Sequence, residues 1–386
     1  MARKSTLNRT LRFVLTLCGI WPDASYVLLY RTFWIVTTTM ILFCHYRYFL
    51  THVYSAKLVD LMDCVSSFLA FSKVIIKCAL FWLNQRKFAE ILAMITKDWN
   101  DCASCEISMR KITSKAKISD RIANTIITLH TVTIFLYCFG IILADVDVND
   151  HTTELPFVNK IELPFSIKTQ RLYRCVLMAQ FFHMILSAWA AGIINALLLT
   201  LTLHIAGQID ILCHWLSQSM PCEDKTAHES VVIATSKIIQ KHQKIIDFSE
   251  NVENMFTHIA LVQFVTNTIM ICLLGFLIVT AIGSPNMMEE ILKSSFFYTI
   301  TNLEAFIFCF AGEYLNNKSK EVGIAAYNCG WYNLQPKDSR VLLFIILRSQ
   351  KQLRLTVGKM MDLSLNSFTS IMNASGSYMS VLLAMQ

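Results

Sequence analysis

Charged residues are scarce in this chain: Asp, Glu, Lys and Arg make up 16% of its 386 residues, whereas 54% are hydrophobic. A soluble domain carries about 25% charged residues, so this composition excludes an ordinary soluble protein and indicates a chain that crosses a membrane several times. The net charge of +7 predicts no nucleic-acid partner, because membrane proteins concentrate Lys and Arg in their cytoplasmic segments.

Helix breakers and linkers are also rare. The chain has six prolines and eleven glycines, and it contains no Gly-rich linker, internal repeat or low-complexity tract. The missing repeats argue against a transporter, since many transporters are built from inverted halves. A single all-α domain over residues 1–386 is therefore predicted.

Catalytic and metal-binding motifs are missing as well. No span contains paired aspartates, a Gly-x-Ser-x-Gly or a His-Glu-x-x-His sequence, so no enzyme activity is predicted. Most of the thirteen cysteines lie within or beside apolar stretches, where a thiol acts as a small hydrophobic group. Cys102 and Cys105 form a lone C-x-x-C pair with no neighbouring histidine, and we predict neither a metal nor a cofactor there. The segments placed outside the cell contain no cysteine, so no extracellular disulfide is expected.

Seven apolar stretches are long enough to cross a bilayer, at about 20 residues per span. They lie near residues 27–50, 63–83, 122–144, 175–209, 256–280, 296–314 and 363–386. The fourth holds 35 residues without a formal charge, which is roughly 50 Å of helix against a hydrocarbon core about 30 Å thick. Its surplus is predicted to tilt or to continue outside the membrane. Residues 230–256 are predicted to form a further helix outside lipid, because their charges fall on one side.

The distribution of Lys and Arg predicts the orientation. The N-terminal tail and the segments 84–122, 206–255 and 312–354 together hold 23 of them, whereas the segments 51–63, 145–170 and 281–295 hold four. The positive-inside rule then places the N-terminus in the cytoplasm and the C-terminus outside. An interfacial amphipathic helix is expected within residues 1–22, and residues 145–170 are expected to form an ordered extracellular loop.

Two lysines and one glutamate lie well inside predicted spans, away from their ends. Lys73 and Lys77 lie one turn apart on one face of the second span, and Glu304 lies deep in the sixth. Because a charge in hydrocarbon is costly, it should face protein or water. One interpretation pairs the lysines with Glu304, and the other places both lysines within reach of cytoplasmic water.

The last stretch, residues 319–386, is predicted to begin as a helix packed outside the membrane and to end as a span. Four polar residues and a final valine recur at helical spacing and so share one face of the predicted span: Asn366, Ser370, Asn373, Ser377 and Val381. One reading is tight helix packing, since small polar residues let membrane helices approach and hydrogen-bond. The other is a wall facing water in a pore, with Val381 as an apolar constriction.

This stretch also carries a specific series of residues. In order they are Ala326-Tyr327, Trp331-Tyr332, Arg340, Leu347-Arg348-Ser349-Gln350, Leu355-Thr356, Gly358-Lys359, Leu363-Ser364, Phe368, Ile371, Asn373-Ala374-Ser375 and Ser377-Tyr378-Met379-Ser380-Val381-Leu382. The series closely resembles the C-terminal signature of insect odorant receptors, over about 60 residues. Leu203-His204 and Gly207-Gln208 match a second pattern of that family. The chain departs from the family at Gln352, usually proline, and at Val357, usually alanine.

The resemblance implies a seven-helix, ligand-gated, non-selective cation channel in the plasma membrane of a sensory neuron dendrite. It implies a heterotetramer with a shared co-receptor subunit, surrounded by membrane lipid. Residues 1–311 would bind a small apolar odorant, residues 318–354 would form a cytoplasmic anchor, and residues 355–386 would line the pore. The chain lacks the longer cytoplasmic insertion of the co-receptor, so it resembles a tuning subunit. A gustatory-type receptor of the same topology is the alternative. A G-protein-coupled receptor is disfavoured by the predicted orientation and by its missing Asp-Arg-Tyr and Asn-Pro-x-x-Tyr motifs.

Site residues follow from the same resemblance. In the family the ligand pocket lies between the second, third, fourth and sixth spans, which suggests Ser67, Phe68, Tyr137, Gly140, Ile141, Met178, Phe181, Phe182, Phe297, Tyr298 and Thr301. Aromatic and Met side chains suit a pocket that recognises shape through dispersion. The expected pore residues are Asn373, Ser377, Tyr378 and Val381, and the expected subunit anchors are Tyr327, Trp331, Arg340 and Arg348.

Overall fold

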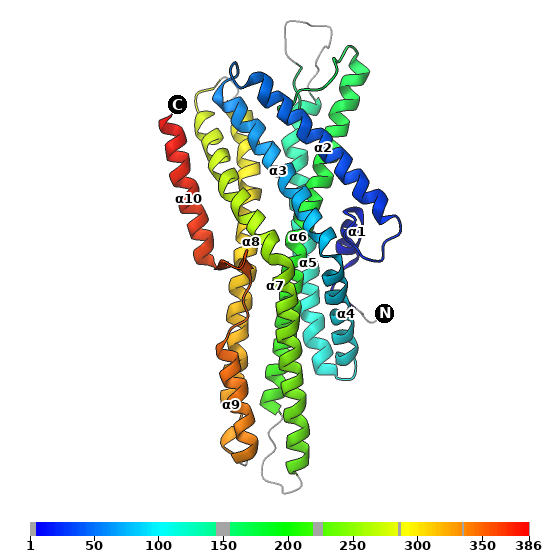
Figure 1. The fold of residues 1–386 in the computed structure, drawn as a ribbon, viewed down its shortest axis with the longest axis vertical. Coiled ribbons are helices and arrows are strands. Elements are labelled where there is room, and N and C mark those ends of the chain that lie inside the picture. Colours follow the sequence, from blue (N-terminus) through cyan, green and yellow to red (C-terminus); the bar gives the residue numbers. More distant parts are fainter. Residues whose placement is uncertain (1–4, 144–154, 219–226, 285–286, 334–335, 386) are drawn as a thin grey trace.

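The computed structural model describes residues 5–143, 155–218, 227–284, 287–333 and 336–385, and these segments are almost entirely helical (Figure 1). The first four helices are α1 (Arg9–Leu17), α2 (Val27–His52), α3 (Leu58–Leu83) and α4 (Gln85–Cys102). The long helices follow as α5 (Glu106–Leu143), α6 (Gln170–Gln218), α7 (Ala227–Thr280) and α8 (Met287–Asn328). The C-terminal part contains η1 (Trp331–Asn333), α9 (Pro336–Gln350), β1 (Thr356–Val357), β2 (Met361–Asp362) and α10 (Leu365–Ala384).

Within the described residues, six helices are long and apolar enough to cross a membrane: α2, α3, α5, α6, α7 and α8. These correspond to the first six predicted spans. The seventh, α10, is 20 residues long and stands beside the upper halves of α7 and α8 in Figure 1. It carries no formal charge, but its Ser and Asn residues leave it without a stretch of 18 residues as apolar as those in the other six.

Three helices are far longer than a bilayer is thick. The helices α6, α7 and α8 contain 49, 54 and 42 residues, and at 1.5 Å per residue α7 is roughly 80 Å long. Figure 1 shows their lower ends continuing past α10 toward α9. The surplus length predicted for the fourth span is therefore present. The helix predicted outside lipid over residues 230–256 is also present, and α7 continues from it into the fifth predicted span without interruption.

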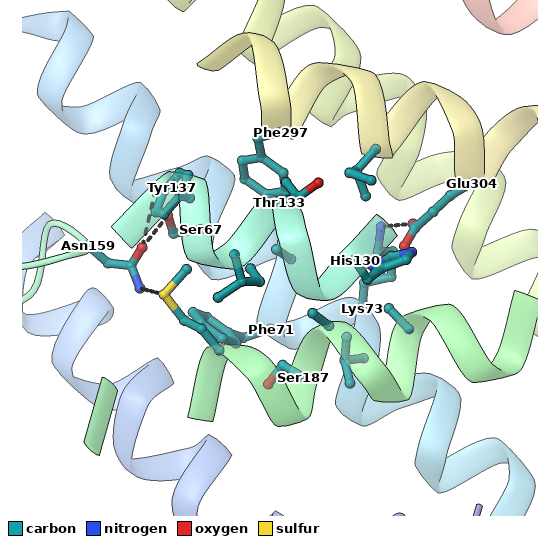
Figure 2. A pocket seen from close by; sticks show the side chains of 17 residues that line it. Ser67, Phe71, Lys73, His130, Thr133, Tyr137, Asn159, Ser187, Phe297 and Glu304 are labelled. Carbon is teal, nitrogen blue, oxygen red and sulfur yellow. Dashed lines mark hydrogen bonds and ion pairs between the residues drawn. The ribbon is translucent and has the colours of Figure 1, made fainter. Parts of the chain in front are cut away.

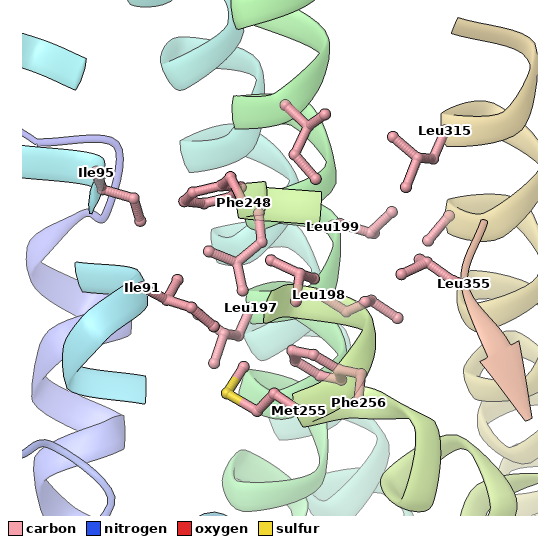
Figure 3. Packing of buried hydrophobic residues seen from close by; sticks show 14 of the residues in the cluster. Ile91, Ile95, Leu197, Leu198, Leu199, Phe248, Met255, Phe256, Leu315 and Leu355 are labelled. Atoms are coloured by element: carbon pink, nitrogen blue, oxygen red, sulfur yellow. The ribbon is translucent and has the colours of Figure 1, made fainter. Parts of the chain in front are cut away.

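The core is centred on α6, which is buried on all sides over residues 190–209. A helix that is apolar around its whole circumference belongs inside a bundle. Figure 3 shows Leu197, Leu198 and Leu199 of α6 surrounded by side chains from other elements, including Phe248 and Phe256 of α7. This packing gives α6, α7 and α8 a common support.

The C-terminal stretch is not one helix, contrary to the prediction from its sequence. After α9 the chain forms a hairpin in which Thr356 pairs with Asp362 and Val357 with Met361. Gly358 and Lys359 turn it with φ of 57° and 62°, a region that favours glycine. The N–H of Gly358 donates to the Thr257 carbonyl at 2.9 Å, and Lys359 forms an ion pair with Glu253. The hairpin thus joins the foot of α10 to α7.

Candidate functional site

A cavity of about 110 Å³ lies among α3, α5, α6 and α8, the four elements in which the sequence predicted a pocket (Figure 2). Its wall is mostly apolar, with Phe71 of α3, Ile134 of α5, Ala188 of α6 and Phe297 of α8 among the lining residues. Such a wall suits small, largely apolar ligands, because their affinity comes chiefly from dispersion and from leaving water.

One end of the cavity is closed by the segment that follows α5. Asn159 of this segment is 6% exposed, and its Oδ1 lies 3.5 Å from the hydroxyls of both Ser67 and Tyr137. The segment is held by α6, because the Tyr173 hydroxyl donates to the Pro156 carbonyl at 2.6 Å. This confirms an ordered loop over residues 155–169, whereas residues 145–154 of that prediction lie outside the described residues.

The opposite, inner end of the cavity carries a buried ion pair. Lys73 Nζ of α3 lies 2.5 Å from Glu304 Oε2 of α8, and each side chain is 4% exposed. Asn267 accepts a further hydrogen bond from Lys73 at 3.1 Å, and Gln263 donates one to Glu304 at 3.0 Å. The extra bonds matter because a buried pair offsets its lost hydration only when the remaining polar atoms are also bonded.

The pairing predicted for both lysines therefore holds for Lys73 alone. Lys77 is also fully buried, which rules out the interpretation in which it reaches cytoplasmic water. Its Nζ has no hydrogen-bond partner among the described residues and lies 5.6 Å from the ring centroid of Phe308. A ring face attracts a cation at this distance.

The predicted ligand residues lie in several different places. Ser67, Tyr137 and Phe297 line the cavity. Phe181 and Ile141 pack in an apolar cluster beside it, and Tyr298 packs with residues of α7 and α10. Thr301 is buried and donates to the Phe297 carbonyl, Phe68 is half-buried, and Gly140 is exposed.

Met178 and Phe182 do not face the cavity in this structure. They are 42% and 57% exposed on the outer surface of α6, while Met184, Ser187 and Ala188 of the same helix line the cavity. The long uncharged sequence of α6 gives no amphipathic signal that separates these faces. The lining residues Phe71, His130 and Asn159 were likewise not singled out from the sequence.

The polar side predicted for the last span is the side of α10 that packs against nothing else in the described chain. Asn366, Ser370, Asn373, Ser377 and Val381 are all exposed. The opposite side is held by the rest of the bundle, since Ile371 and Ser375 are buried and Ser375 donates to the Thr268 carbonyl of α7 at 3.0 Å. Tyr378, the remaining predicted pore residue, is 58% exposed.

The predicted anchor residues lie at the far end of the extended helices. Tyr327 and Trp331 are 65% and 38% exposed, Arg340 is exposed, and Arg348 is half-buried. They adjoin an apolar face of α9 formed by Leu343, Phe344 and Leu347, which we call the α9 face; all three are more than half exposed.

A buried polar cluster ties the N-terminal segment to the extended helices. His204 of α6 lies 2.8 Å from the Thr6 hydroxyl and 3.1 Å from Asp98 of α4, which supports the structural role expected for this histidine. Lys241 of α7 lies 3.4 Å from Asp98. Burial acts to raise the pKa of Asp98, but the hydrogen bond to His204 and the charge of Lys241 outweigh it, so this pKa is lowered.

The sequence is similar to those of known proteins. A sequence profile described as 7tm Odorant receptor matches residues 57–376. Odorant receptor 10 of Aedes albopictus is 31% identical over 160 residues, which is 42% of this chain and 40% of that protein. Odorant receptor 13a of Drosophila melanogaster is 28% identical over 191 residues, or 46% of this chain and 45% of that protein. The matched segments thus span less than half the length of these relatives.

The fold is also found in solved structures. The olfactory receptor OR5 from Machilis hrabei superposes with a TM-score of 0.81 at 15% sequence identity, covering 97% of each chain. The same receptor in complex with eugenol gives a TM-score of 0.80 at 14% identity, covering 97% of this chain and 98% of that one. The profile match over most of the sequence decides the family: this chain is a seven-helix membrane protein of the insect odorant receptor family.

Proposed function

We propose that this chain is the odorant-binding subunit of a ligand-gated cation channel. The observation that carries the proposal is the presence, in one chain, of a mostly apolar cavity and of a span whose polar side is unpacked. The cavity would receive a small volatile molecule, as the related OR5 receptor receives eugenol. The unpacked side of α10 would face ions.

The coupling between the two sites would run through α8. This helix contributes Phe297 and Glu304 to the cavity, while Phe306 of α8 packs edge-on against Phe368 of α10 with ring centroids 5.7 Å apart. A ligand that binds one arrangement of α8 better than another would shift the pore toward the matching state, since only such differential affinity moves a conformational equilibrium.

One α10 helix cannot enclose a pore, so further subunits are required. We propose a heterotetramer with a shared co-receptor, joined through Tyr327, Trp331, Arg340, Arg348 and the α9 face. Exposed apolar patches of this kind mark protein–protein contacts. The assembly would work in the dendrite membrane of a sensory neuron. We propose ligand-binding and pore-lining roles for the residues that the sequence analysis named. Met178 and Phe182 are the weakest candidates for ligand binding, because both side chains are exposed on the outer surface of α6.

The test is to express the chain with and without an insect odorant co-receptor and to record currents across a panel of volatiles. We expect ligand-evoked cation currents only when both subunits are present. Val381→Ser should raise the current without ligand or change ion selectivity, because a polar side chain removes the apolar constriction. Normal surface expression with no response to any volatile would contradict the proposal.

A further inference from the structure

Two polar side chains of α5 that line the cavity have unused hydrogen-bonding capacity. His130 of α5 lines the cavity and is 4% exposed, yet its ring forms no hydrogen bond with any residue that the structure describes. Thr133 lies one turn along and also lines the cavity. Its hydroxyl makes no described bond, whereas the nearby Thr131 donates to the Ile127 carbonyl at 2.7 Å. Buried polar groups normally have partners, so a partner is expected in the cavity.

Packing fixes the His130 ring at this position. A Cβ on Gly192 of α6 would lie 3.0 Å from Cδ2 of the ring and 3.3 Å from Cγ2 of Ile126. A larger residue at position 192 would therefore press against the imidazole. The ring therefore stays at the cavity edge, as Figure 2 shows beside Glu304.

The neighbouring ion pair does not need a charged ligand. Lys73 is bonded to both Glu304 and Asn267, and Glu304 is bonded to both Lys73 and Gln263. The wall between the two ends of the cavity is apolar, with Phe71, Ile134 and Phe297. The cavity therefore suits a compact apolar ligand that carries one neutral hydrogen-bonding group, directed toward the inner end.

We propose that His130 and Thr133 make this cavity select ligands that carry one carbonyl or hydroxyl oxygen over hydrocarbons of the same shape. The inference rests on the proposed odorant-binding function. An imidazole can donate from one nitrogen and accept at the other, and a threonine hydroxyl can do both. A ligand oxygen replaces the bonds that water makes to these groups, whereas a hydrocarbon removes water and leaves them unpaired. That loss corresponds to a preference of about 10- to 100-fold.

The experiment compares half-maximal concentrations for two pairs of probes in cells that express the full chain with an insect odorant co-receptor. Acetophenone is paired with α-methylstyrene, and 2-heptanone with 2-methyl-1-heptene, so that a methylene group replaces the carbonyl oxygen in each pair. The wild type should respond to the ketone at a concentration about 10- to 100-fold lower than to the hydrocarbon. His130→Phe should bring this ratio close to one, because it keeps a ring and removes both nitrogens.

Matched variants separate the hydrogen bonds from the shape of the cavity. His130→Asn should retain most of the preference for the ketone. Thr133→Val should reduce the ratio of the two half-maximal concentrations without a change of side-chain shape. Phe297→Leu should weaken both members of a pair by similar factors, and the exposed His258→Phe on α7 should leave the ratio unchanged. Responses of equal strength to ketone and hydrocarbon in the wild type would overturn this inference and leave the odorant-binding function standing. No response to any volatile would overturn both.

Discussion

At the scale of single residues, the buried ion pair is the most sensitive point. Lys73→Met leaves Glu304 charged and without its cation inside the bundle, which should destabilise the protein by about 3–5 kcal/mol. Thermal unfolding of the purified protein in detergent measures this loss. The double variant Lys73→Met with Glu304→Leu should recover part of it, because the unpaired carboxylate is gone while the buried Lys77 stays in the bundle.

An exposed pair on the same protein provides the control. Arg86 and Glu90 lie 3.4 Å apart on α4, with side chains 94% and 54% exposed. Such surface pairs contribute about 0–1 kcal/mol, so Glu90→Gln should unfold like the wild type. Equal effects of Lys73→Met and Glu90→Gln would show that the buried pair is not the stabilising contact described here.

Asp98 should make stability depend on pH at the acidic end. Its pKa is lowered in the folded protein, so its contribution is complete above the unfolded value of about 3.9 and is lost as pH falls through the folded pKa. Asp98→Asn should therefore lower stability at neutral pH by about 1.5–3 kcal/mol, and the difference from wild type should shrink below about pH 4.

The neighbouring Asp101 is a control that separates the effect of a buried carboxylate on stability from the effect of a charge at the surface. It pairs with Lys244 at 2.9 Å, but both side chains are more than 40% exposed. Asp101→Asn should leave the unfolding temperature nearly unchanged at every pH. A difference between Asp98→Asn and the wild type that persists unchanged at pH 3.5 would contradict the role given to the carboxylate.

How much the sequence could predict also depends on the residue. The polar side of α10 was visible because charge is absent and Ser and Asn recur at helical spacing. Phe71 and His130 could not be predicted as cavity residues. The helices α3 and α5 are apolar on several sides, so no sequence periodicity identifies the face that lines the cavity. Asn159 reaches the cavity only through the path of a loop, which no local pattern encodes.

At the scale of elements, the contact between α8 and the hairpin depends on one glycine. A Cβ on Gly312 of α8 would lie 2.2 Å from the Leu363 carbonyl oxygen, so backbone would have to move. Gly312→Ala should destabilise the protein by about 1–3 kcal/mol and displace the foot of α10. The unfolding temperature and the amplitude of the ligand-evoked current should both fall.

Gly376 of α10 is the matched control for this substitution. Nothing lies within 4 Å of the position that its Cβ would occupy, and alanine is a better helix former than glycine. Gly376→Ala should therefore unfold at or above the wild-type temperature. A Gly312→Ala protein as stable as Gly376→Ala would mean that α8 and the hairpin are not packed as closely as described.

The sequence predicted the membrane spans better than it predicted the connections between helices. The six apolar helices were predicted because their length and composition suffice. The two helical segments predicted over residues 230–256 and 256–280 form the single helix α7, although the sequence changes there from one-sided charge to apolar. The hairpin after α9 was missed because its two strands contain two residues each, too few to show alternation. The family proline expected at position 352 is not needed there, because this hairpin already separates α9 from α10.

At the scale of the whole molecule, the extended helices should govern assembly. Leu343→Asp together with Leu347→Asp places charge on the exposed α9 face, and we expect it to abolish co-purification with the co-receptor while the chain remains folded. Ile107→Asp is the matched control, because Ile107 is an exposed apolar residue on α5 (42% exposed) outside that face. Loss of co-purification with both variants, or with neither, would contradict an anchor at α9.

Channel function requires above all that the exposed side of α10 faces ions in the assembled channel. Single cysteines at Asn373 and Ser377 test it against cysteines at the buried positions Ile371 and Ser375 of the same helix. Each variant is expressed with the co-receptor and exposed to a charged, membrane-impermeant thiol reagent while agonist is applied. We predict rapid modification that changes the current at the first two positions and none at the other two. Equal reactivity at all four positions, or no reactivity at Asn373 and Ser377, would contradict a pore lined by α10.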